Sequence, residues 1–437
     1  MKRWSGFPSK WRVGTVDPVM VGIWSVGLAI RLVFLPVTFH SDLYQIYSRA
    51  ALAVTSGDWF AWNSQLVAQL VHTAWLAFVR LLLPASDGIW SPTAGVAGRG
   101  AQPADIARFL AYPYLARALV LLKLPYLFGD AVTAWLLLRL APDVPRRWLL
   151  VLWWLNPIVI YTSALFGRHE TLWIALLVAG CLAASCQRRW LGFLLSALAA
   201  VARFFPVFVL PFYVVSLRRS WRQVVLALGA TTAAWSLIDL FFVVRSGTSP
   251  TLTLLGDYPH VRYLVALAIP VGDDTPLALF PFVYVLVLCY WIARAPLGIE
   301  AYRAIAGALL CAIVALTPVH PQYVVWAIPF AAPVLARNGS GRVIAGLQVG
   351  LFVLWLLRWG ASVTTELFLP LGQPFVESLP DPQLVAAALI PSAVWQPVVR
   401  AAFTAVTLWI GWLTFEAGTL DRSARRERRG ELVGGRR

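Results

Sequence analysis

Residues 18–47 read PVMVGIWSVGLAIRLVFLPVTFHSDLYQIY, an apolar run that is followed at once by a polar segment. An apolar run of about 20 residues is long enough to cross the hydrocarbon core of a membrane as a helix. We therefore expect the first span at 18–38, with Asp42 just beyond its end. A carboxylate at the mouth of a span lies where it can act at the membrane surface.

Composition predicts that most of the chain lies in the membrane. Hydrophobic residues make up 59% of the 437 residues and charged residues 13%, whereas a soluble domain carries about 25% charged residues. The first apolar run lacks a small-residue cleavage site, so we expect a retained span and not a cleaved signal peptide. The four cysteines lie in or beside apolar runs and predict neither a disulfide framework nor a metal site: Cys181, Cys186, Cys289 and Cys311.

The net charge of +16 is spread along the chain, which argues against one contiguous nucleic-acid-binding patch. Basic clusters recur in short connections between apolar runs, as the positive-inside rule predicts for cytoplasmic loops. They lie at 2–12, 146–147, 188–189, 218–222, 294, 337–342 and 422–437.

These clusters predict an all-α polytopic membrane protein of about twelve transmembrane helices, with both termini cytoplasmic. A long external loop at 39–112 follows the first span and holds an amphipathic helix at 41–56. The apolar segment 59–84 contains several polar residues, which favours an interfacial helix over a full span. The chain would form a single integral-membrane domain, 1–437, with the remaining spans within 113–417 and a basic cytoplasmic tail at 418–437.

The later spans follow from the order of basic loops and apolar runs. Segment 191–217 is flanked by basic clusters at both ends and contains Arg203-Phe204-Phe205-Pro206, so it predicts two short helices meeting at a break. The expected spans besides this pair are 113–140, 148–165, 171–187, 222–243, 276–293, 302–317, 322–336, 342–358 and 396–417.

Asp42 has two interpretations that the local pattern leaves open. As a general base it would take the proton of an acceptor hydroxyl, a role worth about 10²–10⁴ in rate. Alternatively, Ser41 or Asp42 would cap the amphipathic helix that follows.

Charged residues in outer turns are the next candidates. In Arg168-His169-Glu170, the last two side chains could bind sugar hydroxyls or a divalent cation, or simply form a polar turn. Arg203 costs about 2.5–3.5 kcal/mol inside an apolar segment. It could snorkel to the interface, but its fork of donors suits a phosphate.

Two further groups carry polar side chains. Lys123 and Asp130 lie two turns apart on one helix face; Lys123 is a candidate for a lipid phosphate, whereas Asp130 fits charge compensation better. His320 and Gln322 alternate with two prolines in a stiff turn, Thr317-Pro318-Val319-His320-Pro321-Gln322-Tyr323. A histidine there could donate to a phosphate or a leaving-group oxygen.

These pieces, in this order, resemble the integral-membrane GT-C glycosyltransferases that use polyprenyl-phosphate sugars, in particular polyprenyl-phosphate-mannose-dependent mannosyltransferases. The resemblance rests on Ser41-Asp42-Leu43-Tyr44, Leu122-Lys123-Leu124-Pro125 with Asp130, Leu155-Asn156-Pro157 with Phe166-Gly167-Arg168-His169-Glu170, Arg203 with Pro211, and His320-Pro321-Gln322-Tyr323. Many relatives read Gly-Gln-x-Asp where this chain has Gly167-Arg168-His169-Glu170, and many have Lys in place of Arg203.

The resemblance implies an inverting transfer of a sugar, with mannose expected, from a polyprenyl phosphate to a glycolipid or glycan acceptor. Asp42 would be the catalytic base. Arg203, His320 and Lys123 would bind the donor phosphate, and the sugar or acceptor would contact His169, Glu170, Gln322 and Tyr44. No cofactor is implied with certainty, and the family leaves a divalent cation open. The site would face the outside of the plasma (inner) membrane, in cell-envelope glycolipid biosynthesis.

Two other function classes compete with the transferase. A transporter or flippase of lipid-linked sugars should show inverted repeats and polar residues near the membrane midplane. No internal repeat is evident, and Asp130 and Asp239 are the residues that suit it best. In a non-catalytic membrane subunit, Asp42, Arg203 and His320 would be dispensable.

Overall fold

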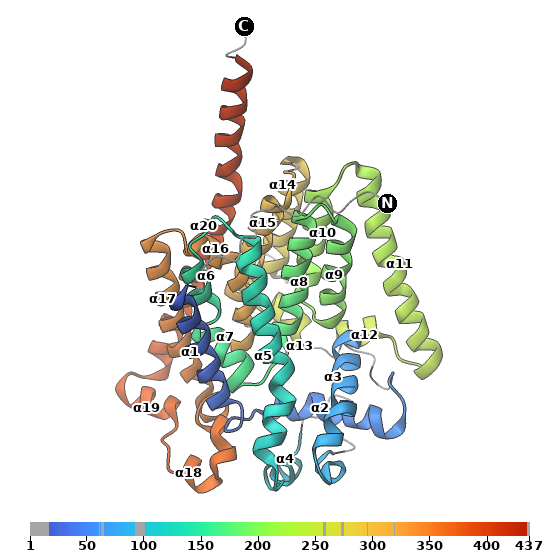
Figure 1. Ribbon diagram of the computed structural model, residues 1–437, viewed down its shortest axis with the longest axis vertical. Coiled ribbons are helices and arrows are strands. Elements are labelled where there is room, and N and C mark those ends of the chain that lie inside the picture. The colour runs from blue at the N-terminus through green and yellow to red at the C-terminus, as the bar shows by residue number, and fades with distance from the viewer. Residues whose placement is uncertain are drawn as a thin grey trace.

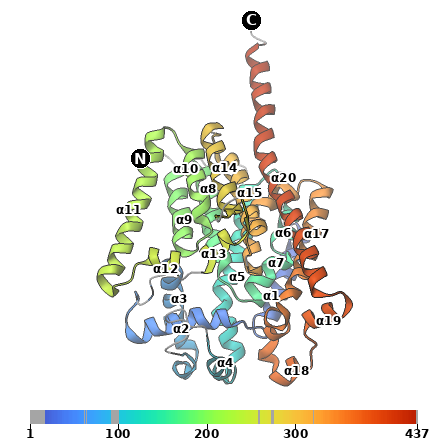
Figure 2. The ribbon, with the colours of Figure 1, turned by 180° about the vertical axis from the view of Figure 1, so that it is seen from behind.

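The computed structural model describes residues 17–60, 62, 65–91, 101–256, 259–271, 275–294, 296–318 and 320–434, without the side chains of 259–260 and 419–434. The described part of the chain is all-helical except for one two-residue antiparallel ladder. Most long helices run side by side in one bundle, and α2 lies across one end of it (Figure 1). Seen from behind, α20 projects from the opposite end (Figure 2).

The first helices confirm the predicted start of the fold. Helix α1 (Pro18–Phe34) occupies the expected first span, and α2 (Ser41–Ser56) has the bounds predicted for the amphipathic helix. The α2 N-cap is His40, whose Nδ1 accepts from the Asp42 backbone N–H at 3.1 Å. Gly57, at φ 70°, ends the helix in the left-handed conformation that glycine tolerates.

The rest of the loop between the first two spans is more helical than predicted. Within the predicted interfacial helix 59–84, the α-helix begins only at Leu66. Some residues within 85–105, where the sequence predicted a loop, form short helices. The elements are α3 (Leu66–Val79), η1 (Arg80–Leu82), η2 (Ser86–Ile89) and α4 (Pro103–Leu110).

The helices from α5 to α10 are joined by turns, some of which lie close to Asp42. The expected span at 148–165 is bent by 42° at Asn156-Pro157, because Asn156 caps a new helix that Pro157 begins. The break predicted in 191–217 is present: Arg203 has an extended backbone and Pro206 begins the second helix. The bounds are α5 (Leu115–Leu140), α6 (Arg146–Trp153), α7 (Pro157–Ile160), η4 (Tyr161–Leu165), α8 (Glu170–Ser185), α9 (Arg189–Ala202) and α10 (Pro206–Leu217).

The C-terminal half continues in the same manner. Its elements are α11 (Trp221–Ser246), α12 (Pro250–Gly256), α13 (Pro259–Ala266), β1 (Ala268–Ile269), β2 (Leu277–Ala278), α14 (Leu279–Arg294), α15 (Ile299–Leu316), η5 (Pro321–Trp326), α16 (Ile328–Leu335), α17 (Gly339–Leu356), η6 (Leu357–Val363), η7 (Thr365–Leu371), α18 (Gln373–Glu377), α19 (Pro382–Leu389) and α20 (Ser392–Gly434). The predicted tail at 418–437 lies in α20 as far as 434, and its last three residues lie outside the described ones.

The expected count of about twelve spans is confirmed only in part. Among the described residues, five helices are long and apolar enough to cross a membrane, and the bent pair of α6 and α7 makes six. Six further apolar helices have 10–17 residues, fewer than the roughly 20 that a straight crossing needs. The short ones are α1, α3 with η1, α8, α9, α10 and α14.

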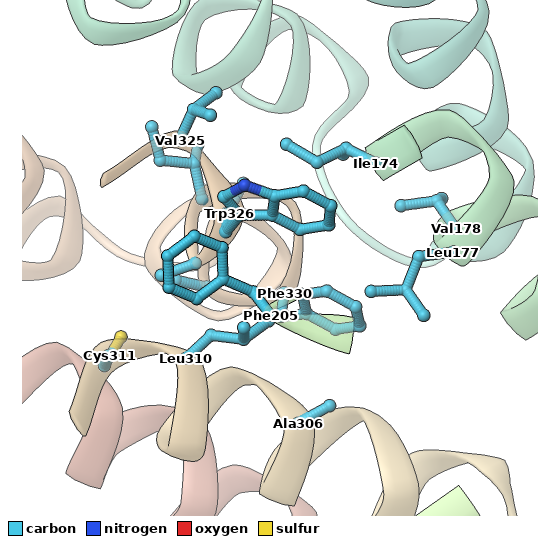
Figure 3. Packing of buried hydrophobic residues seen from close by; sticks show 14 of the residues in the cluster. Ile174, Leu177, Val178, Phe205, Ala306, Leu310, Cys311, Val325, Trp326 and Phe330 are labelled. Atoms are coloured by element: carbon cyan, nitrogen blue, oxygen red, sulfur yellow. The ribbon is translucent and has the colours of Figure 1, made fainter. Parts of the chain in front are cut away.

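The core lies where η5 meets α8, α10 and α15. Trp326 is buried against Phe205, Ile174 and Leu310 in a cluster of aliphatic and aromatic side chains (Figure 3). Its indole Nε1 donates to Glu170 Oε2 at 2.7 Å. The apolar core therefore fixes a charged residue of the outer turn that leads into α8.

A second buried contact joins the first span to the next one. Arg31 Nε donates to Asp130 Oδ2 at 2.8 Å, with both side chains fully buried, and Ser163 Oγ donates to the same oxygen. Arg31 also donates to the Trp154 carbonyl at 2.7 Å. This pairing agrees with charge compensation as the role of Asp130.

Candidate active site

Asp42 lies in the first turn of α2, next to Arg168 and His40. Its side chain is 28% exposed, and its Oδ2 lies 3.2 Å from Arg168 Nη1 and 3.8 Å from His40 Nδ1. The helix cap is provided by His40 and not by Ser41 or Asp42. The carboxylate is therefore not consumed by capping, and the positive end of the helix dipole adds to its stabilisation.

The electrostatic surroundings keep Asp42 ionised. Burial alone would raise the pKa of Asp42, but electrostatic interactions, of which the one with the Arg168 guanidinium is the largest, outweigh it and lower the pKa to about 2. Burial lowers the pKa of His40 to about 4 and also lowers that of His320, although Asp42 opposes both shifts. At neutral pH, a carboxylate thus faces a guanidinium and two neutral imidazoles.

The turn that presents Arg168 is tightly built. Gly167 adopts φ 71°, and a Cβ there would lie 3.1 Å from Lys123 Cε and 3.4 Å from Leu43 Cδ2. The ring of Phe166 stacks on His40 with centroids 3.8 Å apart. Only glycine combines this backbone with this close approach, so the turn is held in one register beside α2.

Glu170 and Arg203 form a buried ion pair next to this turn. Arg203 donates through Nη2 to Glu170 Oε1 at 2.5 Å and through Nε to Oε2 at 3.2 Å. Its Nη1 donates to Gln65 Oε1 at 2.9 Å, and its guanidinium lies over the Tyr323 ring at 5.3 Å. The donors predicted for a phosphate are thus directed at protein acceptors, and the carboxylate predicted for sugar is fully buried.

Lys123 is directed at oxygen atoms of the segments that precede Asp42 and Arg168. Its fully buried Nζ donates to the carbonyls of Leu35, Thr38 and Ala164 and to Thr38 Oγ1, at 2.5–3.2 Å. Leu35 and Thr38 precede Asp42, and Ala164 precedes Arg168. The ammonium group therefore ties together the two segments that carry the acid and the arginine.

Replacing Lys123 tests this bracing role. We expect Lys123→Met, which keeps an unbranched side chain but removes the ammonium donor from the Leu35, Thr38 and Ala164 carbonyls, to lower the free energy of unfolding by about 1–3 kcal/mol. Thermal denaturation of the purified protein measures it. A donor KM close to wild type is expected beside the lost stability; a raised donor KM with unchanged stability would instead support the predicted phosphate contact.

His320 lies at the start of η5 and interacts electrostatically with Asp42. It lies within electrostatic reach of Asp42, Arg168 and Arg358. Its ring stacks toward Trp359 with centroids 6.5 Å apart, and Arg358 lies over the same indole at 4.9 Å. Arg358 is exposed, and the sequence alone gave no reason to include it in the site.

The remaining predicted contacts differ in their surroundings. Buried His169 accepts from Trp173 Nε1 through Nδ1, and its Nε2 has no partner among the described residues. Gln322 is also buried, and its Oε1 lacks a partner in the same part of the chain. Tyr44 is fully occupied: its hydroxyl donates to the Ile89 carbonyl and accepts from the Ser91 N–H.

No group of three or more His, Cys, Asp or Glu side chains placed to hold a metal ion occurs in the described part of the chain. The divalent cation that the resemblance leaves open stays a prediction.

The comparison with protein families gives one match. Residues 105–219 of the 437-residue chain match the family described as alpha-(1->6)-mannopyranosyltransferase, N-terminal domain. This match to a mannosyltransferase family agrees with the polyprenyl-phosphate-mannose-dependent GT-C class that the sequence resembles. No curated protein and no solved structure matches the chain.

The matched segment runs from α4 to just beyond α10 and includes Lys123, Arg168, Glu170 and Arg203. The two residues that best suit the transporter alternative both have protein partners. Asp130 forms an ion pair with Arg31, and Asp239 accepts from Ser249 Oγ and the Thr251 N–H near the end of α11.

Proposed function

We propose that Asp42 is the general base of an inverting mannosyl transfer. It removes the proton from the acceptor hydroxyl as that oxygen attacks the anomeric carbon of mannose, and the bond to the donor phosphate breaks. The observation that carries the proposal is one partly exposed carboxylate beside Arg168, His40 and His320. An ionised acid beside a guanidinium and two imidazoles fits both halves of the reaction, proton removal and departure of a phosphate.

A single displacement is supported by the state of the neighbouring carboxylate. A retaining mechanism needs a second carboxylate that attacks the anomeric carbon. Glu170 is fully buried and holds Arg203 and the Trp326 indole, so it is poorly placed for attack. One carboxylate then accounts for inversion of a β-linked donor, in agreement with the α linkage in the family's description.

The donor phosphate would be bound by Arg168, His320 and Arg358. His320 lies within electrostatic reach of Arg168, Arg358 and Asp42, and a cation is what a departing phosphate needs. Neutral His320 can still donate one ring N–H. The geometry favours Arg203 and Lys123 as positioning residues, because each is committed to protein oxygens.

Arg168 would then have two successive partners. While it contacts Asp42, it lowers the basicity of that carboxylate. When the donor phosphate draws the guanidinium toward itself, Asp42 becomes a stronger base. The donor would thus switch on the base before the acceptor is deprotonated.

Replacing Arg168 tests this coupling. In Arg168→Gln, burial is no longer opposed by the arginine, so the pKa of Asp42 rises and the acid limb of kcat/KM moves upward by about one to three pH units. The donor KM should rise as well. A pH–rate profile checks the shift, with Arg80→Gln as control because Arg80 pairs with Asp87 in a partly exposed contact. An unmoved acid limb would contradict the coupling.

The partners and orientation follow the family. We propose polyprenyl-phosphate mannose as donor and a glycolipid or glycan as acceptor. The Asp42 end would face the outside of the plasma (inner) membrane, and both termini would be cytoplasmic. The predicted twelve crossings would require the short apolar helices to cross where the bilayer is locally thin.

The function is tested with purified protein, a panel of polyprenyl-phosphate sugars and a membrane lipid extract. We expect mannose to be transferred and the product to carry the anomeric configuration opposite to that of the donor. Retention of configuration would contradict the single displacement, and consumption of another sugar in preference to mannose would contradict the donor.

A further inference from the structure

We propose that the cavity between α9, α10 and α11 binds the phosphate of an anionic phospholipid. This site is separate from the reaction at Asp42 and does not depend on it. The cavity has a volume of about 160 Å³, whereas one water needs roughly 10–15 Å³. It therefore has room for a phosphate group.

Three arginines line this cavity: Arg189 at the start of α9, and Arg218 and Arg219 between α10 and α11. Gln187 and Gln223 add amide donors to the lining. None of the described residues that line the cavity is acidic. The surroundings thus offer cations and N–H donors, the chemistry that recognises a phosphate.

Hydrogen bonds hold Arg189 in place in the cavity wall. Arg189 Nη1 donates to the Leu217 carbonyl at 2.8 Å, and the Tyr213 hydroxyl donates to the Arg189 carbonyl at 2.7 Å. A Cβ on Gly192 would lie 2.3 Å from that hydroxyl. The close approach of α9 and α10 therefore needs glycine, and it fixes the cavity wall.

The other two arginines lie between α10 and α11, Arg218 partly buried and Arg219 exposed. Arg218 lies over the Trp221 ring at 4.5 Å and also donates to the Val215 carbonyl. The Arg219 backbone N–H donates to Gln223 Oε1 at 3.0 Å, and its side chain is exposed. An exposed guanidinium at the rim can close over a bound phosphate.

The position of the cavity fits a lipid headgroup. Trp190 and Trp221 beside it are 62% and 48% exposed, and exposed tryptophans concentrate at the membrane–water interface. The cavity lies at the end of α9 opposite Ala202 and Arg203, so it is at the far end of the bundle from Asp42; Figure 1 shows α9–α11 ending on the side from which α20 projects. Basic pockets between helices at this depth bind anionic headgroups.

The same phosphate chemistry could come from a free anion, and the experiment separates the two sources. Full-length protein in detergent is titrated with phosphatidylglycerol, and the retained lipid is counted by native mass spectrometry. Diacylglycerol serves as the phosphate-free lipid, and inorganic phosphate is the competitor. We expect one retained phosphatidylglycerol, no retained diacylglycerol and no displacement by phosphate at equal concentration.

A charge-matched pair of variants locates the site. Arg219 lines the cavity, whereas exposed Arg222 belongs to the same basic cluster but does not line it. We expect Arg219→Gln to weaken lipid retention about fivefold or more, Arg219→Lys to restore part of it, and Arg222→Gln to leave it unchanged. Equal weakening in Arg219→Gln and Arg222→Gln would overturn the proposal, as would retention of diacylglycerol or displacement by inorganic phosphate.

Discussion

The Asp42→Asn protein is expected to transfer mannose about 10²–10⁴ times more slowly than wild type, the usual worth of a general base. Asparagine keeps the size of the side chain but cannot accept the acceptor's proton. The helix start should survive, because His40 caps α2 through the backbone N–H of residue 42. Steady-state transfer from polyprenyl-phosphate mannose measures the loss.

Asp87→Asn is the matched control for this variant. Asp87 is an exposed carboxylate that also contacts an arginine, Arg80, at 2.8 Å. Its replacement should leave the rate within about twofold of wild type, since surface ion pairs contribute little. If Asp42→Asn is as active as Asp87→Asn, the base is another residue.

Glu170→Leu is expected to lower the free energy of unfolding by about 3–5 kcal/mol, because it leaves Arg203 buried without its partner. Arg203 loses both hydrogen bonds of its fork, and the Trp326 indole loses its acceptor. Thermal denaturation in detergent, together with the yield of folded protein, checks this. Activity should fall with the folded fraction, because the turn that presents Arg168 adjoins this pair.

A second replacement distinguishes a structural role from a binding role. In Glu170→Leu combined with Arg203→Met, neither member of the pair is charged, so no unpaired charge is left buried at this position and most of the lost stability should return. Exposed Glu377 provides the control, and Glu377→Leu should leave stability nearly unchanged. If Glu170→Leu is as stable as wild type but has a raised KM, then Glu170 binds sugar, as the sequence predicted.

Local signals predicted the individual helices well. The amphipathic pattern after the first span gave the bounds of α2, and Arg203-Phe204-Phe205-Pro206 gave the break between α9 and α10. Helix ends and breaks depend on residues that are close together in the chain, so a sequence can predict them. The ion pair of Arg203 could not be predicted in this way, because its partner Glu170 lies 33 positions away.

The number of spans was harder to predict because apolar composition does not set helix length. Helix α10 has 12 residues between Pro206 and Leu217, which is about 18 Å at 1.5 Å per residue. The hydrocarbon core is about 30 Å thick. Prolines and caps shorten such helices, and the apolar pattern extends across the breaks.

The site required pairings that no single segment reveals. Arg31 lies within the expected first span, where a charge inside an apolar helix needs a partner. That partner is Asp130, in a helix that the sequence places much later in the chain. The same argument joins Glu170 to Arg203. The meeting of Asp42 with Arg168 and His320 brings together three distant turns, and only the folded arrangement shows it.

The central claim is that Asp42 acts in the chemical step and not in binding the donor. It is tested most directly by single-turnover mannose transfer in the Asp42→Asn protein, with donor affinity measured separately on the same sample. The account predicts donor affinity within a few-fold of wild type and a transfer step slowed about 10²–10⁴-fold. A transfer step at the wild-type rate, or a loss explained entirely by weaker donor binding, would contradict it.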